Sequence, residues 1–177
     1  GRTAAADGTS QWITGQAARA DAHLLRARSD AILVGAGTVR DDDPRLTVRG
    51  VVAPDGMPVR EPLRVVLGSA PAGAAIHPCL ELTGDPAEIL DLLGARDVVQ
   101  LMIEGGATVA GRFHAEGLVD RYVVYLAPAF MGGSGGRPLL AGETAASIDD
   151  LVRGRIDQVR RLGEDLRIDV VAPRRRN

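Results

Sequence analysis

Short apolar runs alternate with amphipathic segments along most of this 177-residue chain. Runs of strand length lie at 31–34, 63–67, 76–82, 98–103 and 121–126, the third being the weakest. Helical spacing of apolar residues predicts helices over 15–28, 85–93 and 107–116, and a short helix after residue 37 that Pro44 ends. Asp85 followed by Pro86 is a matched start for the second of the longer helices.

The other segments connect or close these elements. We expect a short extended piece over 1–9 with a turn at Asp7-Gly8, an extended piece at 46–49, and a surface loop over 50–62. Residues 156–162 and 166–171 alternate on either side of Gly163 and predict a hairpin. The pattern predicts one α/β domain over 1–177, a three-layer fold with a mixed, mostly parallel sheet and a C-terminal antiparallel hairpin.

Two junctions between a strand and a helix are rich in glycine. They read Gly35-Ala36-Gly37-Thr38 and Glu104-Gly105-Gly106-Ala107-Thr108. At the carboxyl ends of neighbouring strands they would form one crevice, whose backbone N–H groups suit the phosphates of a dinucleotide. The alternative is that each glycine set only ends a strand and permits close packing. Arg40 occupies the place of a third glycine, which excludes the Rossmann fingerprint.

Carboxylates and arginines follow the first junction closely. Asp42 is a candidate for proton transfer, whereas Asp41 and Asp43 are better interpreted as helix caps. All basic side chains in the chain are arginine, which binds phosphate by bidentate geometry.

Composition narrows the function classes further. A net charge of −2 gives no global field for nucleic acid or a membrane surface, and we interpret Arg174-Arg175-Arg176 as a solvated tail. No apolar run has the length of about 18 residues that a membrane span needs. A single cysteine, Cys79, excludes an internal disulfide and fits a cytoplasmic setting.

A zinc centre is not expected. His114-Ala115-Glu116 and Pro78-Cys79 copy parts of the zinc deaminase pattern, but residue 82 is Leu where a second thiolate is needed, and the order is reversed. No ligand spacing is evident around His23 or His77.

Several motifs, in order along nearly the whole chain, resemble the reductase domain of bifunctional riboflavin-biosynthesis deaminase/reductases. They are Asp-Gly-Thr-Ser-Gln-Trp-Ile-Thr-Gly (7–15), Ala-Arg-Ala-Asp-x-His-x-Leu-Arg (18–26), Ala-Ile-Leu-Val-Gly-x-Gly-Thr-Val (31–39), Asp-Asp-Pro-Arg-Leu-Thr-Val-Arg (42–49), Pro-Leu-Arg-Val-Val-Leu (62–67), Glu-Gly-Gly-Ala-Thr-Val-Ala-Gly (104–111), Gly-Leu-Val-Asp (117–120) and Leu-Ala-Pro-Ala-Phe-Met-Gly-Gly (126–133). The resemblance implies a dihydrofolate-reductase-like fold. It also implies NADPH-dependent reduction of the ribose of 5-amino-6-(5-phosphoribosylamino)uracil to a ribityl chain.

The resemblance also implies roles for particular residues. Substrate contacts are expected at Ser10, Arg26, Leu46, Arg49 and Glu104. Cofactor contacts are expected at Trp12, Gly35, Gly37, Thr38, Asp42, Ser69, Gly105, Gly106, Ala107, Thr108, Val109, Ala110, Gly111 and Arg112. Asp42 and Glu104 are the candidate catalytic residues. The alternative for Trp12 is a core residue.

Two departures from the family pattern accompany these roles. Position 68 is Gly where the family often has Asp, which weakens the role of Ser69. The second departure is that residues 1–177 do not include the family's first strand, which ends in Ser-Leu-Asp, or its zinc deaminase domain. Both are expected upstream of Gly1.

The expected chemistry is hydride transfer from NADPH to C1 of the opened ribose, with the protein orienting both molecules. Two alternatives stay open: reduction of another pyrimidine- or pteridine-like substrate, and a non-catalytic dinucleotide-binding domain. A homodimer is expected, with the strand at 121–130 and the C-terminal hairpin as candidate faces.

Overall fold

A computed structural model describes residues 1–52, 59–143 and 145–173. The basic tail at 174–176 lies outside the described residues, and so does part of the predicted loop at 50–62. The chain divides into two compact units, one made of residues 1–19 and 111–173 and the other of residues 20–110.

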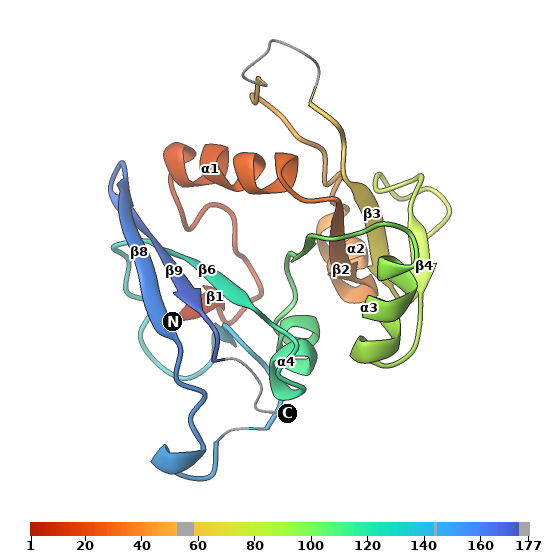
Figure 1. Cartoon of the computed structure of the whole chain (residues 1–177). Coiled ribbons are helices and arrows are strands. Elements are labelled where there is room, and N and C mark those ends of the chain that lie inside the picture. The colour runs from red at the N-terminus through yellow and green to blue at the C-terminus, as the bar shows by residue number, and fades with distance from the viewer. Residues whose placement is uncertain (53–58, 144, 174–177) are drawn as a thin grey trace. The chain divides into compact units, whose positions relative to one another are not determined.

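A four-stranded parallel sheet forms the centre of the unit at 20–110, with strand order β4-β3-β2-β5 (Figure 1). Its strands are β2 (Ala31–Gly35), β3 (Leu63–Leu67), β4 (Leu80–Leu82) and β5 (Leu101–Ile103). All five residues of β2 are buried, which is why the segment is an uninterrupted apolar run. The core beside it contains Ile32, Val34, Val39, Leu46, Val66 and Ile76.

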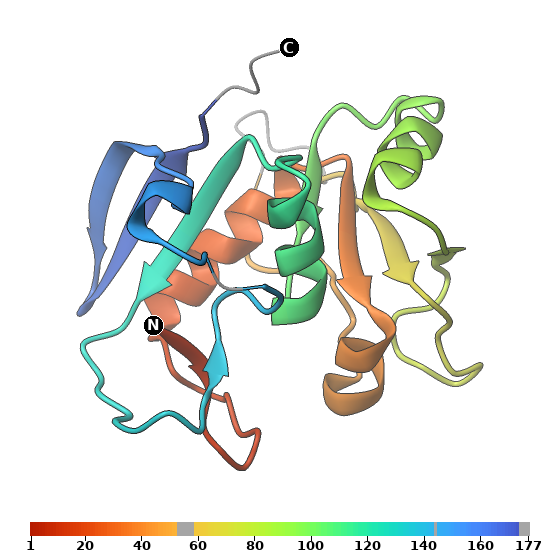
Figure 2. The same ribbon diagram turned by 90° about the horizontal axis from the view of Figure 1, so that it is seen from below.

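Helices connect these strands. Helix α1 (Gln16–Ala27) begins in the other unit, α2 (Ala36–Asp42) follows directly on β2, and α3 (Pro86–Gly94) precedes β5 (Figure 2). The α3 start is as the sequence predicts, because Asp85 is the N-cap and its backbone N–H donates to the Glu88 carboxylate at 3.3 Å. Helix α4 (Ala107–Ala115) follows β5 and crosses into the other unit.

The unit at 1–19 and 111–173 contains an antiparallel sheet of order β6-β9-β8. Its strands are β6 (Arg121–Leu126), β8 (Arg155–Leu162) and β9 (Asp165–Val171). A separate two-stranded ladder joins β1 (Arg2–Ala4) to β7 (Arg137–Pro138), and a 3-10 turn, η1, covers Ile148–Asp150.

The α/β class, with parallel pairing and a C-terminal antiparallel hairpin, is confirmed. Three details of the sequence prediction are wrong. In the piece expected to be extended at 46–49, Leu46 instead adopts a left-handed φ of 48°, and its side chain lies in the core. The strand expected at 98–103 begins only at Leu101, because the Asp30 carboxylate accepts the backbone N–H groups of Val99 and Gln100.

The third correction concerns the segment at 76–82, where regular strand is limited to Leu80–Leu82. The cis peptide bond between His77 and Pro78 lies just before it. The pair β1–β7 was not expected, since a two-residue strand carries no periodicity.

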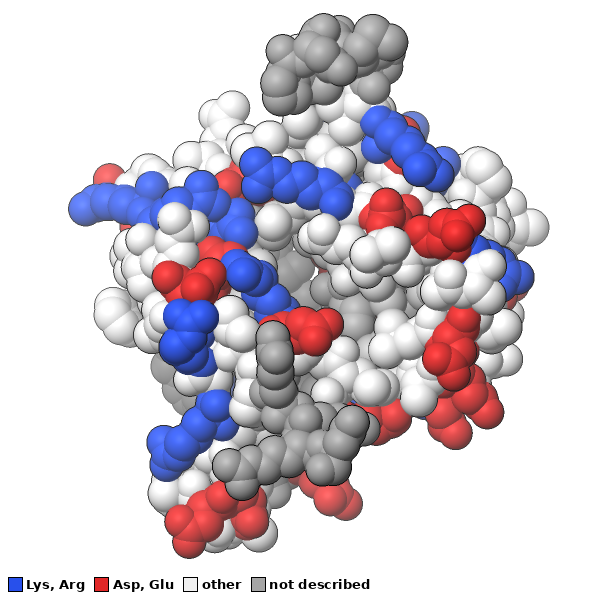
Figure 3. Space-filling model, viewed as in Figure 1, with Lys and Arg blue, Asp and Glu red and all other residues white. Residues whose placement is uncertain are grey.

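Within the described residues, no helix is long and apolar enough to cross a membrane. Arginines and carboxylates are interspersed over the face in Figure 3, as the net charge of −2 suggests.

Gly111 offers a test of packing in α4. A Cβ added there would lie 1.7 Å from the backbone oxygen of Ala141, whereas a Cβ at Gly94, the last residue of α3, meets nothing within 4 Å. We expect Gly111→Ala to lower the free energy of unfolding by about 1–3 kcal/mol through overpacking. Gly94→Ala, its matched control, should raise it by up to about 1 kcal/mol through helix propensity. Urea unfolding measures both; equal effects would contradict the close approach.

Candidate functional site

The two glycine junctions meet at one edge of the parallel sheet. Strands β2 and β5 are parallel neighbours, so their carboxyl ends lie side by side. A Cβ added at Gly106 would lie 3.3 Å from Thr38 Oγ1, and one at Gly105 would lie 3.4 Å from Thr38 Cγ2. The prediction that both turns lie at the ends of neighbouring strands is therefore confirmed.

The two glycines of the first junction, Gly35 and Gly37, differ in what surrounds them. Gly35 is buried, and its Cβ would come within 2.8 Å of Val109 Cγ2, so this position serves packing. Gly37 is exposed, and its Cβ would meet nothing closer than the Arg40 guanidinium at 4.0 Å. Space at Gly37 is therefore available to a ligand.

The second junction presents backbone N–H groups at the start of α4. Gly105 and Gly106 have φ angles of 85° and 67°, which residues with a side chain rarely adopt. The Gly106 carbonyl accepts the first helical hydrogen bond, from Ala110. The N–H groups of the first turn have no partner within the helix itself, as at any helix start, and this end favours an anion. Thr108 is exposed there, while Val109 is buried.

Arg26 and Glu104 form a bidentate ion pair within the unit at 20–110. Arg26 Nε donates to Glu104 Oε2 at 2.7 Å, and its Nη2 donates to the other carboxylate oxygen. Arg26 Nη1 also donates to the Thr47 carbonyl at 3.1 Å. The two side chains are only 13% and 28% exposed, so helix α1 fixes the carboxylate that ends β5.

His23 belongs to this cluster, although no role was predicted for it. Its Nδ1 accepts the backbone N–H of Arg49 at 3.3 Å. Burial lowers the pKa of His23, the charges of Arg26 and Arg49 lower it further, and Glu104 opposes them. The spacing of three residues between His23 and Arg26 on one helix was the available signal.

The remaining predicted residues of this unit differ in accessibility. Asp42 ends α2 and is exposed, and Ser69 follows β3 and is exposed. The side chain of Leu46 is 3% exposed and packs in the core, so it presents little surface to a ligand. The Asp43 carboxylate accepts the Ala75 N–H at 2.7 Å, a structural role, and Asp43 itself is the C-cap of α2.

In the other unit, Trp12 is 69% exposed, so the interpretation of Trp12 as a core residue is wrong. The Arg19 guanidinium lies over its ring, 4.5 Å from the centroid, and Arg19 also donates to the Thr14 carbonyl. The Ser10 carbonyl accepts the Ile13 N–H, which forms a turn beside Trp12.

Gly111 and Arg112 also lie in this unit, on α4. Gly111 packs against the backbone of Ala141, whereas Arg112 is exposed. His114 Nδ1 shares a hydrogen bond of 2.7 Å with the Tyr122 hydroxyl.

Comparisons with known proteins agree on one family. A family model described as the RibD C-terminal domain matches residues 1–168. The riboflavin biosynthesis protein RibD of Mycobacterium tuberculosis H37Rv is 40% identical over 181 residues, which cover 97% of this chain and 51% of that protein. RibD of Escherichia coli K12 is 33% identical over 208 residues, which cover 97% and 56%. The chain spans about half the length of the curated relatives it matches.

Solved structures show the same fold. Acinetobacter baumannii RibD, form 1, superposes with a TM-score of 0.86 at 30% identity, covering 98% of this chain and 55% of that one. The Thermotoga maritima diaminohydroxyphosphoribosylaminopyrimidine deaminase/5-amino-6-(5-phosphoribosylamino)uracil reductase gives 0.78 at 24% identity, covering 98% and 53%.

The lowered pKa of His23 predicts a pH effect. Below its unfolded pKa of about 6.5, the unfolded chain binds the proton more readily than the folded chain, so His23 destabilises the fold increasingly as the pH falls. His23→Gln should therefore lose less thermal stability than the unmodified chain between about pH 7 and pH 5. Melting temperatures across this range measure it, with His114→Gln as the control. Parallel curves for the unmodified chain and His23→Gln would contradict the assignment.

Proposed function

We propose, from the premise that this chain belongs to the RibD C-terminal domain family, that it reduces 5-amino-6-(5-phosphoribosylamino)uracil with NADPH in riboflavin biosynthesis. The observation that carries the proposal is the meeting of two glycine turns at the end of the parallel sheet, in the same unit as the Arg26–Glu104 pair. The curated relatives are named riboflavin biosynthesis proteins, and this supports the choice of pathway.

The residues present fit a dinucleotide. The open space at Gly37, the left-handed backbone of Gly105 and Gly106, and the N–H groups at the start of α4 together suit a phosphate-bearing ligand. Thr38 contributes a hydroxyl at the same place, and Ser69 another after β3. We propose that these groups hold the cofactor, with Trp12, Asp42 and residues 107–112 as further contacts. The choice of NADPH over NADH follows the family resemblance.

Bound NADPH would supply the hydride. The chain's own residues then bind and orient the substrate: Glu104 accepts N–H groups of the pyrimidine ring, and Arg26 holds the plane of its carboxylate through two hydrogen bonds. Three of the Arg26 N–H groups are engaged by Glu104 and Thr47, and two are left to donate to a substrate oxygen. The exposed side chain of Arg49 is then the better candidate for the substrate phosphate.

Proton transfer is assigned to Asp42, because its carboxylate is exposed at the end of α2. Ser10 and the backbone at Leu46 are proposed as further substrate contacts, the latter because the Leu46 side chain itself is buried.

The direct test follows the loss of NADPH absorbance with purified chain and 5-amino-6-(5-phosphoribosylamino)uracil, repeated with the chain extended by the upstream strand that the resemblance implies. Oxidation that depends on this substrate supports the proposal. Activity on dihydrofolate alone would favour a reductase of another pteridine-like substrate. Tight NADPH binding with no oxidation in either version would favour a non-catalytic binding domain.

Glu104→Gln separates substrate binding from cofactor binding. The amide keeps the shape but loses the charge that Arg26 pairs with and an acceptor for the pyrimidine N–H groups. We expect kcat/KM to fall about 100-fold, as for a lost charge-assisted interaction of about 2–3 kcal/mol. The NADPH dissociation constant should change by less than about threefold. Glu164→Gln, at a carboxylate 82% exposed, is the control; equal losses of substrate turnover and NADPH binding would contradict the role of Glu104.

We also propose that the chain forms a homodimer through the apolar face of the antiparallel sheet. Tyr122, Val124 and Leu126 of β6 share that face with Leu166, Ile168 and Val170 of β9 and with Ile156 and Val159 of β8. Ile156 is 61% exposed and Val159 52% exposed. The exposed part of this strip, at Leu126, Ile156 and Val159, suits burial against a second copy.

We also propose a cytoplasmic location, which the free thiol of Cys79 and the proposed use of NADPH support.

The dimer face predicts the effect of a charge. Ile156→Lys should shift the chain from dimer to monomer in sedimentation equilibrium, because the ammonium group would be desolvated at the interface. Val99→Lys, at an apolar residue 93% exposed in the other unit, is the matched control and should leave the dimer intact. A monomeric unmodified chain, or a dimer insensitive to Ile156→Lys, would contradict the proposed face.

A further inference from the structure

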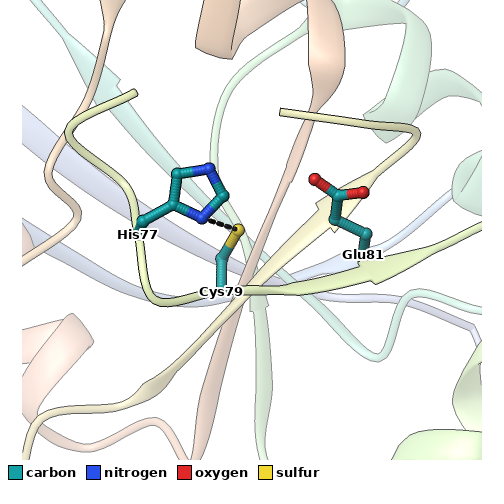
Figure 4. Close-up of side chains that lie close together, drawn as sticks. All are labelled: His77, Cys79 and Glu81. Carbon is teal, nitrogen blue, oxygen red and sulfur yellow. Dashed lines mark hydrogen bonds between the residues drawn. The ribbon is translucent and has the colours of Figure 1, made fainter. Parts of the chain in front are cut away.

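Three side chains with metal-binding chemistry converge on the segment that leads into β4. They are His77, Cys79 and Glu81, and Figure 4 shows them pointing toward one another. Alternate residues of an extended chain project to the same side, which brings these three together although Pro78 and Leu80 separate them. One ligand atom from each lies within 4.8 Å of the other two. The expectation that His77 has no ligand spacing around it is therefore wrong.

The closest pair already has the separation that a metal ion requires. His77 Nδ1 and Cys79 Sγ are 3.5 Å apart. Bonds of about 2.3 Å to sulfur and about 2.05 Å to nitrogen at a tetrahedral angle place the two donor atoms about 3.6 Å apart. Glu81 is the third donor: its carboxylate is exposed, and its ligand oxygen lies within 4.8 Å of the ligand atoms of His77 and Cys79, so a small shift of the side chain brings it to the same centre.

Hydrogen bonds to the backbone orient the His77 and Glu81 side chains, as they orient the ligands of bound metal ions in other proteins. The second ring nitrogen of His77, Nε2, lies 2.9 Å from the Pro71 carbonyl. A proton on Nε2 donated to that carbonyl leaves the lone pair of Nδ1 facing Cys79, and such a backbone contact is the usual way a ligating histidine is oriented. Glu81 Oε1 accepts the Ala70 N–H at 2.8 Å, and Oε2 is left to face the centre.

Charge and softness select the kind of ion. A thiolate and a carboxylate carry two negative charges, which neutralise a divalent cation beside a neutral imidazole. Sulfur and nitrogen ligands suit Zn²⁺ and disfavour Mg²⁺ and Ca²⁺. Arg64, which donates to the His77 carbonyl at 3.4 Å, adds a positive charge nearby and weakens the attraction.

A reactive thiol is the competing explanation for this cluster. Burial raises the pKa of the Cys79 thiol, and the Glu81 charge raises it further. A thiol with a raised pKa is a poor nucleophile in the absence of a metal, and a bound metal ion would have to displace its proton. The convergence of three donor atoms, rather than the titration of Cys79, is what favours a metal site.

We propose that His77, Cys79 and Glu81 form a three-ligand site for a zinc-type divalent cation, with a fourth position open to water or a further ligand. This site is distinct from the residues assigned to substrate and cofactor, and it does not depend on the proposed reductase activity.

Cobalt substitution tests the site directly. Cys79 is the only cysteine of the chain, so sulfur-to-cobalt charge-transfer absorption on titration with Co²⁺ reports this residue alone. We expect one ion per chain, displaced by Zn²⁺. Zinc affinity, measured by competition with a chromogenic chelator, should fall at least about 100-fold in Cys79→Ser and at least about 10-fold in His77→Gln and Glu81→Gln.

Glu164→Gln and His114→Gln are the matched controls and should bind zinc like the unmodified chain. Circular dichroism and metal-free melting temperatures establish that each variant is folded. If Cys79→Ser fails to fold, the loss of affinity in His77→Gln gives the same test. The proposal is overturned by the absence of stoichiometric binding, by the absence of charge-transfer absorption, or by zinc affinity unchanged in folded Cys79→Ser or His77→Gln.

Discussion

The burial of β2 between two parallel neighbours is the constraint on which the proposed site depends. All five residues of Ala31–Gly35 are buried, and the strand is paired residue by residue with β3 and β5. A slip of one residue would reverse the side chains between the two faces, so the register is strongly fixed. The opposition of Leu33 and Ile103 then decides where both strands end. Thr38 meets Gly105 and Gly106 because of this register.

The Arg26–Glu104 pair gives this strand end a defined charge. Its two side chains are mostly buried, and a buried charge without its partner is costly, so the pair is held more firmly than a surface ion pair. Two parallel hydrogen bonds also fix the plane of the carboxylate, which a single contact would leave free to rotate. Burial lowers the pKa of His23, and the charges of Arg26 and of Arg49 lower it further. Helix α1 therefore contributes both the arginine that pairs with Glu104 and the histidine whose pKa that arginine lowers.

Periodicity alone predicted most of the regular elements, because β2, β3 and β6 are apolar runs and α3 has an explicit start at Asp85-Pro86. The failures arise where a side chain competes with the backbone ladder. At Val99 and Gln100 the distant Asp30 carboxylate takes the N–H groups that a longer β5 would use. A contact across 69 residues leaves no trace in a local pattern.

The candidate site was only partly accessible to the same reasoning. Sequence spacing and resemblance selected Arg26 and Glu104 but not their mutual pairing, and they assigned no role to His23. They also missed the group around Cys79, because a search for known ligand motifs overlooks donors at alternate positions of an extended segment. Such positions converge only when the chain is extended locally, and that conformation depends on the turn before β4 rather than on composition.

In the antiparallel sheet the usual distribution is reversed, with charged side chains on the buried face and apolar side chains on the more exposed face. Asp165, Arg167 and Asp169 of β9 are buried, while Leu166, Ile168 and Val170 on the other face stay partly open. The buried charges are satisfied locally. Asp169 forms two hydrogen bonds with Arg167, which hold the pKa of its carboxyl below the ordinary value, and Asp165 accepts the Gly15 N–H at 2.6 Å.

The buried face of this sheet carries charged side chains and therefore gains little hydrophobic stabilisation. The attraction between paired ions inside a protein is roughly offset by the free energy that their desolvation costs. The sheet's apolar residues on the open face gain stabilisation only when something covers them, at about 25 cal/mol for each Å² removed from water. Ile156 at 61% exposure and Val159 at 52% are the least covered of that row in β8. The proposed dimer would therefore stabilise this unit by covering the exposed side chains of Ile156 and Val159.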